Sequence, residues 1–390
     1  MDIQQRGIIT LVKSAITGEK YSLPNDFDLT VAAQTGKKHG ISAMLYYGAV
    51  NCGIEQSSPA MQEMFMYTCK SVFKGERQIY EIKRIFKAFD KEKIEYMPLK
   101  GIGLRNLYPK PEMRPMSDAD ILIKLSAYEK IQTVMLNLGF KDGGITDHEI
   151  KWHNPSLYVE LHSRLIPSYN RDYYAYFGDG WQLATVCDGT RYSMTAEDQM
   201  VYLFTHFAKH YREAGIGIKH IVDIWVYRKN NPDLDEKYIK TELEKLQLYD
   251  FYVNSIATLS VWFNGDENTA VTELITDFIF NSGAGGTREN YLITSAIKAS
   301  KKSGNIKNVR LVKVFNTIFL PYRKMCLIYP FLKKYPIFLP IMWAVRIISK
   351  LFKKNKLAEY KKDVESISDE TVLNFQKSLN FVGLDFNFKE

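Results

Sequence analysis

Two aspartates constrain the fold of this chain more than any other feature. Asp118 and Asp120 stand one residue apart and open an apolar, β-prone run that continues to Leu125. Side chains alternate along a strand, so both carboxylates project from the same face. Like charges held this close raise each other's pKa unless a cation neutralises them, and magnesium is the usual cation for such a pair. The spacing therefore predicts a strand that carries a divalent metal site.

Two further motifs flank this strand in the sequence. Lys100 and Gly101 form a turn between a short apolar segment, residues 94–99, and a short helix predicted at residues 102–108. Downstream, Glu160 lies between apolar residues in a segment predicted to be a strand. A third carboxylate on a neighbouring strand would complete a set of oxygen ligands, the arrangement that metal-assisted transfer from a nucleoside triphosphate requires.

In this order, the three motifs resemble those of the nucleotidyltransferase superfamily, which has the polymerase-β-like fold. More narrowly, they resemble the uncharacterised bacterial nucleotidyltransferases, often encoded in capsule and natural-product gene clusters. The Lys-Gly turn, the segment from Arg114 to Ile123 and the strand around Glu160 carry the resemblance, over roughly residues 80–165. Asp-x-Asp alone is frequent by chance, and its flanking motifs make the signal more specific.

The resemblance implies a role for each carboxylate. Asp118 and Asp120 would hold two Mg²⁺ ions, with Mn²⁺ as an alternative, that bridge the triphosphate and the attacking oxygen. Glu160 would bind the metal on the nucleophile side or act as the base for the acceptor hydroxyl. The competing interpretations are a solvated strand edge or capping pair for the aspartates, and an ordinary exposed strand residue for Glu160.

The resemblance also implies nucleotide contacts. Lys100 and Gly101 occupy the turn that cradles phosphates, where glycine lets the backbone approach the anion. Many superfamily members have Gly-Gly or Gly-Ser here, so Lys-Gly is a departure. Ser117 precedes the metal strand, and Arg114, on a proline-rich loop, is a candidate triphosphate clamp because guanidinium matches phosphate oxygens. A surface charge in a loop is an equally good interpretation of Arg114.

Histidines provide further candidates. His162 shares a strand face with Glu160 and could orient it or touch substrate, with a structural histidine as the alternative. His206 and His210 are four residues apart on a predicted helix, a spacing that suits zinc, although we favour a helix packed beside the nucleotide site. Asp223 lies on an otherwise apolar helix and needs a partner, for which the basic side chains of the His206–His210 helix are candidates.

The fold class predicted is α+β. Residues 92–194 would form a small mixed β-sheet nucleotidyltransferase core with helices, between helical regions at 1–91 and 195–390. Helical periodicity is clearest before the core, where one buried helix face is predicted from apolar residues at Met61, Met64, Phe65, Cys69, Val72 and Phe73.

Composition adds few constraints. The net charge of +8 fits a nucleotide, a nucleic acid or an anionic membrane surface equally well. The four cysteines have no disulfide or metal spacing, and the N-terminus lacks a signal-peptide layout, so we expect a cytoplasmic protein. Residues 335–356 combine an apolar run with basic residues and could contact the inner membrane face peripherally; a core helix with a solvated basic face is the favoured alternative.

The leading hypothesis is a magnesium-dependent enzyme that moves a nucleoside monophosphate from a nucleoside triphosphate to an acceptor hydroxyl or phosphate and releases pyrophosphate. The resemblance favours a small molecule or sugar derivative as the acceptor, and no clear nucleic-acid module is recognisable. The alternatives are toxin-like nucleotidylation of a protein or RNA, and an inactive nucleotide-binding or membrane-associated scaffold.

Overall fold

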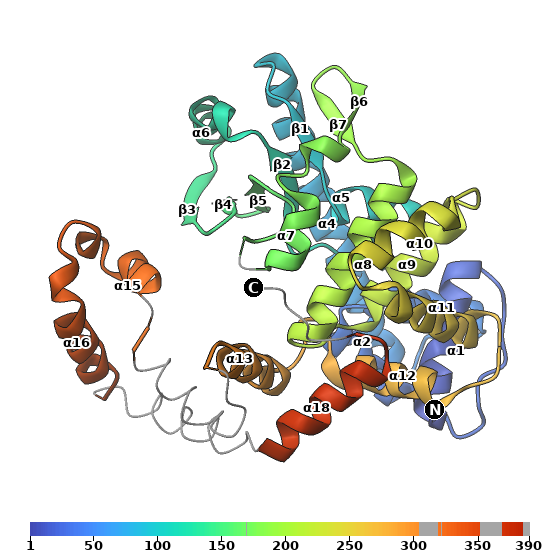
Figure 1. Ribbon diagram of the computed structural model, residues 1–390. Coiled ribbons are helices and arrows are strands. Elements are labelled where there is room, and N and C mark those ends of the chain that lie inside the picture. Colours follow the sequence, from blue (N-terminus) through green and yellow to red (C-terminus); the bar gives the residue numbers. More distant parts are fainter. Residues whose placement is uncertain (169, 304–318, 321, 352–368, 385–390) are drawn as a thin grey trace. The chain divides into compact units, whose positions relative to one another are not determined.

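The computed structural model of this chain describes residues 1–168, 170–303, 319–320, 322–351 and 369–384 (Figure 1). As predicted, the fold is mixed α+β, and the described strands form one seven-stranded sheet. The chain divides into two compact units. The first comprises Met1–Lys209, Ile216–Gly285 and the residues from Val382, and the second comprises His210–Gly215 and Gly286–Phe381. The three-part division of the sequence remains a prediction.

The sheet belongs to the first unit and has the strand order β3-β4-β5-β2-β1-β7-β6. Strand β2 is parallel to β5 and antiparallel to β1, and β1 is parallel to β7. The hairpins β3-β4, β4-β5 and β6-β7 are antiparallel. The strand bounds are β1 Tyr96–Pro98, β2 Ala119–Ile123, β3 Lys141–Ile145, β4 Glu149–His153, β5 Tyr158–His162, β6 Thr185–Asp188 and β7 Arg191–Ser193.

One face of the central strands forms the hydrophobic core of the α+β part. Ile121 of β2 and Leu161 of β5 pack there against Ile85 of helix α4 (Pro59–Lys91) and Met135 of helix α6 (Tyr128–Asn137). Because side chains alternate, residues between these apolar positions point to the opposite face. That opposite face receives Asp120, Glu160 and His162, and it positions the candidate site.

Helix α4 begins at a capped end, where Ser58 Oγ accepts a hydrogen bond from Met61 N at 3.3 Å. It is one long helix, but its predicted buried face is only partly right. Met61 and Met64 are buried, whereas Cys69 and Val72 are exposed, and Phe65 and Phe73 are 49% and 66% exposed. The buried positions along the middle of the helix are instead the small or polar residues Thr68, Gly75 and Gln78.

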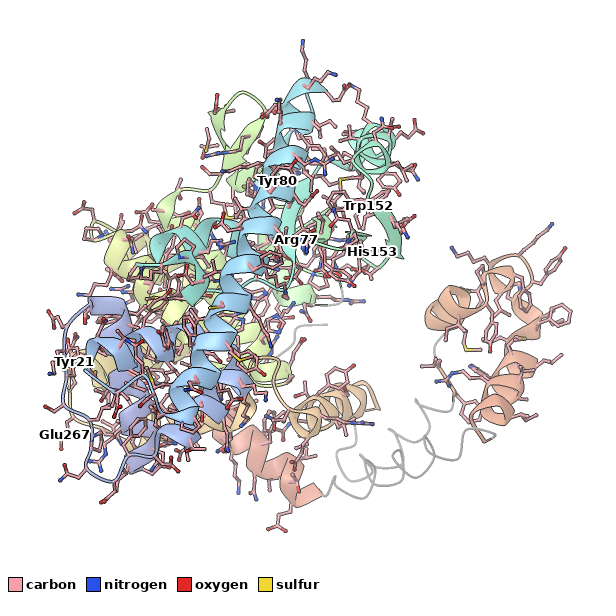
Figure 2. All side chains as sticks on the ribbon, turned by 180° about the vertical axis from the view of Figure 1, so that it is seen from behind. Tyr21, Arg77, Tyr80, Trp152, His153 and Glu267 are labelled. Atoms are coloured by element: carbon pink, nitrogen blue, oxygen red, sulfur yellow. The ribbon has the colours of Figure 1, made fainter. Side chains whose placement is uncertain are left out.

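The reason is what this part of α4 faces. Gln78 Nε2 donates to the backbone carbonyl of Met116 at 3.3 Å, so this side of the helix packs against the loop before β2 through a polar side chain. Figure 2 shows Arg77 and Tyr80 along the same helix; Arg77 donates to Ser156 Oγ at 2.8 Å, and Tyr80 is 64% exposed. Apolar periodicity therefore located the helix but misassigned its buried side.

Further helices complete the first unit. Before α4 come α1 (Ile3–Thr17), α2 (Leu29–His39) and α3 (Ser42–Asn51), and the short α5 (Gly101–Leu104) follows β1. After the sheet residues come α7 (Arg171–Phe177), most of α8 (Ala196–Glu213), α9 (Ile218–Asn230), α10 (Glu236–Lys245), α11 (Tyr249–Phe263) and α12 (Ala270–Ser282).

The second unit contains α13 (Arg288–Ser303), α15 (Tyr322–Ile328), α16 (Leu339–Leu351) and α18 (Asp369–Phe381). Met325, Cys326 and Leu332 form a small buried cluster there, and Trp343 Nε1 donates to the Leu320 carbonyl at 2.9 Å. Of the predicted basic amphipathic segment, residues 352–356 lie outside the described residues. No helix in the described part of the chain is long and apolar enough to cross a membrane.

Candidate active site

The polar face of the sheet brings two acidic strands together. In the parallel ladder between β2 and β5, Asp120 lies opposite Glu160 and Leu122 lies opposite His162. Glu160 and His162 are two residues apart and therefore share the face of Asp120. Residues 42 positions apart thus meet: His162 Nε2 donates to Asp120 Oδ1 at 2.8 Å.

Asp120 is buried and held by two partners. Besides His162, Lys100 Nζ donates to its Oδ1 at 2.9 Å. Burial alone would raise the pKa of this carboxyl, but Lys100 and His162 outweigh it, and the pKa falls well below its usual range. The pKa of Lys100 is raised, since Asp120 outweighs the effect of its burial. Both side chains are therefore charged at neutral pH.

The Lys100-Gly101 turn puts this lysine in place through an uncommon backbone conformation. Lys100 has a φ of +41°, a region that costs a non-glycine residue about 1–3 kcal/mol. The next position admits only glycine without movement, because a Cβ on Gly101 would lie 2.6 Å from Arg114 Nη1 and 3.1 Å from the Met116 side chain. Such strain is typical of functional turns.

Glu160 is the more accessible carboxylate, with its side chain 21% exposed. Lys151, on the neighbouring strand β4, contacts Glu160 Oε1 at 3.0 Å and Glu149 Oε2 at 3.3 Å. Glu160 Oε2 lies 4.0 Å from His162 Nε2. Strands β2, β4 and β5 thus each contribute a carboxylate to this face, and Lys100 and Lys151 balance part of the charge.

Asp120, Glu160 and His162 bring one ligand atom each to within 4.8 Å of one another, as a metal-binding group would. The buried Nδ1 of His162 also has no hydrogen-bond partner within the described chain. Two carboxylates and an imidazole fit a divalent cation such as Mg²⁺ or Mn²⁺, and the imidazole suits transition metals better. The ion's identity is therefore not fixed by these ligands.

The part of Asp118 in the metal site stays a prediction. It lies just before β2, half-buried, and its Oδ1 accepts a hydrogen bond from Ser117 Oγ at 2.7 Å. Among the described residues it belongs to neither group of converging ligand atoms. The second such group is His148, Glu149 and His162, so His162 is common to both. Burial lowers the pKa of His148 to about 4, which keeps it neutral at pH 7.

Of the two interpretations of Arg114, a phosphate clamp and an exposed loop charge, the structure excludes the exposed loop charge. Arg114 is 6% exposed, and its Nε and Nη2 each donate to Asp223 at 2.9 Å. Tyr108 OH donates to the same carboxylate at 2.7 Å. Asp223 therefore has Arg114 as its ion-pair partner, rather than a basic group of α8. The guanidinium joins the proline-rich loop to α9, and this explains why it is not free to act as a clamp in this structure.

Helix α8 runs beside the site. The charges of Lys100 and Asp120 act on the buried Tyr202 of this helix, and Lys209 acts on His148. His206 and His210 are half-buried on α8, one turn apart. Neither histidine belongs to a converging group of three metal ligands in the described part of the chain.

Sequence reasoning missed several side chains of this site. Glu149 and Lys151 could have been found, since the alternation Glu149-Ile150-Lys151-Trp152 predicts a strand with a polar face. Lys219 could not, because only the fold carries α9 to the loop before β2. Its Nζ lies 3.5 Å from the Pro115 carbonyl, and burial, together with nearby Arg114, lowers the pKa of Lys219 to about 8.

Comparison with known proteins bears on this site. No curated relative matches the chain. A solved structure that matches is "Solution Structure of Antibiotic-Resistance Factor ANT(2'')-Ia Reveals Substrate-Regulated Conformation Dynamics", at 12% identity over 48% of this chain and 97% of that one, with a TM-score of 0.31. The family described as uncharacterised nucleotidyltransferase matches residues 25–264, more than half of the sequence. Membership supports transfer of a nucleoside monophosphate group from a triphosphate, generally with divalent metals. As its motifs predicted, the chain belongs to the uncharacterised nucleotidyltransferase family.

Proposed function

We propose that this protein transfers a nucleoside monophosphate from a nucleoside triphosphate to a hydroxyl or phosphate of a small molecule or sugar derivative, with release of pyrophosphate. The observation that carries the proposal is the convergence of Asp120 and Glu160 on one sheet face, with Asp118 directly before β2. Family membership supports the reaction class. The choice of a small molecule or sugar derivative as the acceptor follows from the gene clusters that often encode the group this chain resembles.

In this proposal Asp118, Asp120 and Glu160 hold the cation, with His162 as a fourth ligand or as the group that orients Asp120. Bound Mg²⁺ or Mn²⁺ would neutralise charge on the triphosphate and stabilise the entering and leaving oxygens. Asp118 lies outside the converging group, but its charge acts on Lys100, which pairs with Asp120.

The lysines and the turn have supporting roles. Lys100 and Lys151 hold the carboxylates in position until the cation and nucleotide arrive. Ser117 directly precedes Asp118 in the sequence, and Gly101 follows Lys100, which pairs with Asp120, so both are candidates for contact with the triphosphate. His206 and His210 of α8 are further candidates for contact with the nucleotide. Glu160, more accessible than Asp120, either binds the cation on the nucleophile side or takes the proton of the acceptor hydroxyl.

The test is a pyrophosphate-release assay with each of the four ribonucleoside triphosphates and a panel of sugars, sugar phosphates and amino alcohols. We expect release that requires Mg²⁺ or Mn²⁺ and one class of acceptor. In Glu160→Gln it should fall at least about a hundredfold, the scale of a lost general base. Retained turnover in both Glu160→Gln and Asp118→Asn would refute the proposal. Lys83→Ala, an exposed change on α4, is the matched control.

The toxin-like alternative makes a different prediction. If the acceptor is a protein or an RNA, the small-molecule panel should give no release, and expression should arrest growth unless Asp118 or Glu160 is replaced. Label from an α-³²P triphosphate would then appear in macromolecules of the host extract.

We further propose that the protein is cytoplasmic and touches the inner membrane face through the region of α16. Ile337, Ile341 and Ile348 are 82%, 56% and 53% exposed, and Lys333 and Lys334 lie close by in the sequence. Exposed apolar residues next to basic ones suit an anionic lipid surface. Co-sedimentation with anionic but not neutral vesicles, lost in Ile337→Ser/Ile341→Ser, would support this contact; equal sedimentation by the variant would contradict it.

A further inference from the structure

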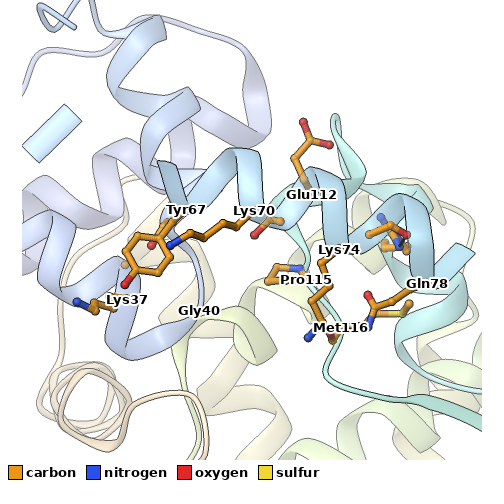
Figure 3. Close-up of a pocket in the computed structure, with 14 residues that line it drawn as sticks. Lys37, Gly40, Tyr67, Lys70, Lys74, Gln78, Glu112, Pro115 and Met116 are labelled. Atoms are coloured by element: carbon orange, nitrogen blue, oxygen red, sulfur yellow. Dashed lines mark hydrogen bonds between the residues drawn. The ribbon is translucent and has the colours of Figure 1, made fainter. Parts of the chain in front are cut away.

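A second polar site lies in the same unit, away from the carboxylates. A cavity of about 250 Å³ is bounded by the end of α2, the middle of α4 and the loop before β2 (Figure 3). Lys37, Lys70, Lys74 and Arg105 line it, and Glu112 is the single acidic residue among its lining side chains. Figure 3 shows Lys70 and Lys74 on the α4 side of the cavity and Pro115 and Met116 on the loop side.

The charge of this cavity is strongly one-sided. The lining contains four cationic side chains and one carboxylate, that of Glu112. The Glu112 carboxylate already accepts a hydrogen bond from Tyr47 OH at 2.6 Å. Lys37 lies 3.5 Å from the exposed Glu63. Within the described part of the chain, neither Lys70 nor Lys74 has a carboxylate partner. Cations gathered in a concave site raise the local concentration of anions.

Arg105 is the most informative member of the group. It is only 4% exposed, and its Nε has no hydrogen-bond partner among the described residues. Its guanidinium makes a long hydrogen bond from Nη1 to the Gly75 carbonyl at 3.4 Å, and the charges of Glu76 and Glu112 act on it from nearby. Burying an unsatisfied charged donor costs free energy, which an anion in the cavity would recover. Guanidinium is the donor best suited to phosphate.

Gly75 makes this arrangement possible. A Cβ at this position would lie 2.7 Å from Arg105 Nη2, so glycine lets the guanidinium approach α4. Glycine in the interior of a helix lowers the stability of that helix by about 1 kcal/mol relative to alanine. A helix of 33 residues thus contains a costly residue where the buried arginine needs room.

We infer that this cavity binds a phosphoryl group carried by the acceptor. The inference of an anion site stands on the cavity alone, whereas its assignment to the acceptor rests on the proposed function. Two observations connect it to the carboxylates. Pro115 and Met116 line the cavity and precede Asp118 by three and two residues, and the charges of Lys74 and Asp118 both act on Lys219. An acceptor anchored by its phosphate could therefore extend toward the metal strand.

The first experiment titrates the full chain with inorganic phosphate, without nucleotide or divalent ions, by calorimetry. We expect saturable binding that weakens about tenfold or more in Lys70→Ala/Lys74→Ala, since two of the four cations are removed. Gly75→Ala should also weaken it by displacing Arg105, and Lys83→Ala should leave it unchanged. Equal affinity in the wild type, the double variant and Gly75→Ala would overturn the anion site, as would the absence of saturable binding.

The second experiment repeats the titration at saturating nucleoside triphosphate and Mg²⁺. Unchanged phosphate affinity supports an acceptor site, whereas competition would assign the cavity to the nucleotide's own phosphates and overturn the acceptor assignment. Nucleotide binding is measured in a separate titration, so that the proposed function and the anion site are tested independently. A chain that binds phosphate but no nucleotide would refute the proposed function and leave the anion site standing.

Discussion

Lys100 and Asp120 are charged, largely buried and 2.9 Å apart. Removing one partner of such a pair leaves the other as an uncompensated buried charge, which is more costly than removing both. We predict that Asp120→Asn and Lys100→Met each lower the free energy of unfolding by about 3 kcal/mol. The double variant should lose less than the sum of the two. Urea unfolding of all four proteins measures this coupling, and strictly additive losses would contradict it.

Lys219 gives a prediction about pH. Because its pKa is lowered to about 8, its charge is lost as the pH rises from 7 to 9. If this ammonium faces the triphosphate, the affinity for nucleotide should fall about tenfold over that interval, as the protonated fraction falls. Lys219→Arg keeps its charge and should show no such fall. A wild-type affinity that does not change between pH 7 and pH 9 would exclude Lys219 from the nucleotide site.

At the scale of elements, contact between α1 and α3 depends on Gly48. A Cβ there would lie 2.0 Å from the Leu11 carbonyl oxygen, a backbone atom that cannot rotate away. Gly48→Ala should therefore force the helices apart and lower the free energy of unfolding by about 2 kcal/mol, the usual scale of overpacking. Gly103→Ala in α5, where a Cβ meets nothing within 4 Å, is the matched control and should cost nothing. Equal unfolding midpoints would contradict the close contact.

Elements with a strong local signal were predictable from the sequence. The metal strand, the strand of Glu160 and the long helix before the core all occur, because alternation and helical periodicity record local burial. The burial of α4 was not predictable, since its middle faces a loop and a cavity rather than apolar side chains. Periodicity reports which residues are apolar, whereas burial also depends on what the fold brings against them.

The site shows the same limit. Asp120, Glu160 and His162 share a face because of strand alternation, which the sequence contains. The Arg114–Asp223 pair, the place of Lys219 and the buried Arg105 depend on contacts between residues far apart in the chain. No local pattern predicts such partners, and for that reason the sequence left Arg114 open as a phosphate clamp or a loop charge.

At the scale of the whole molecule, His39 connects three helices. Its Nδ1 accepts a hydrogen bond from Ile218 N at 3.3 Å, and its Nε2 donates to the Phe280 carbonyl at 3.1 Å. The neutral imidazole therefore links α2 to α9 and α12 by hydrogen bonds. Burial lowers its pKa from 6.5 to about 4. The unfolded chain therefore binds the proton more readily than the folded one between these pH values.

Folding stability should consequently fall as the pH drops from about 6.5 to about 4, by at most about 3 kcal/mol for this residue. His148, also lowered to about 4, acts in the same direction. We predict that His39→Gln removes about half of this acid dependence, while His153→Gln leaves it intact. Urea unfolding at pH 7 and pH 5 measures the loss of stability between these pH values. The same loss in His39→Gln as in the wild type would contradict the assignment of a neutral His39.

The measurement that tests the central claim most directly is calorimetric titration of the full chain with ATP, GTP, CTP and UTP, with and without Mg²⁺. If Asp120 and Glu160 form the cation site of a nucleotidyltransferase, at least one nucleotide binds only with Mg²⁺, and Glu160→Gln, confirmed as folded by its unfolding curve, loses that binding. Nucleotide binding that persists without the divalent ion and in Glu160→Gln would contradict the account.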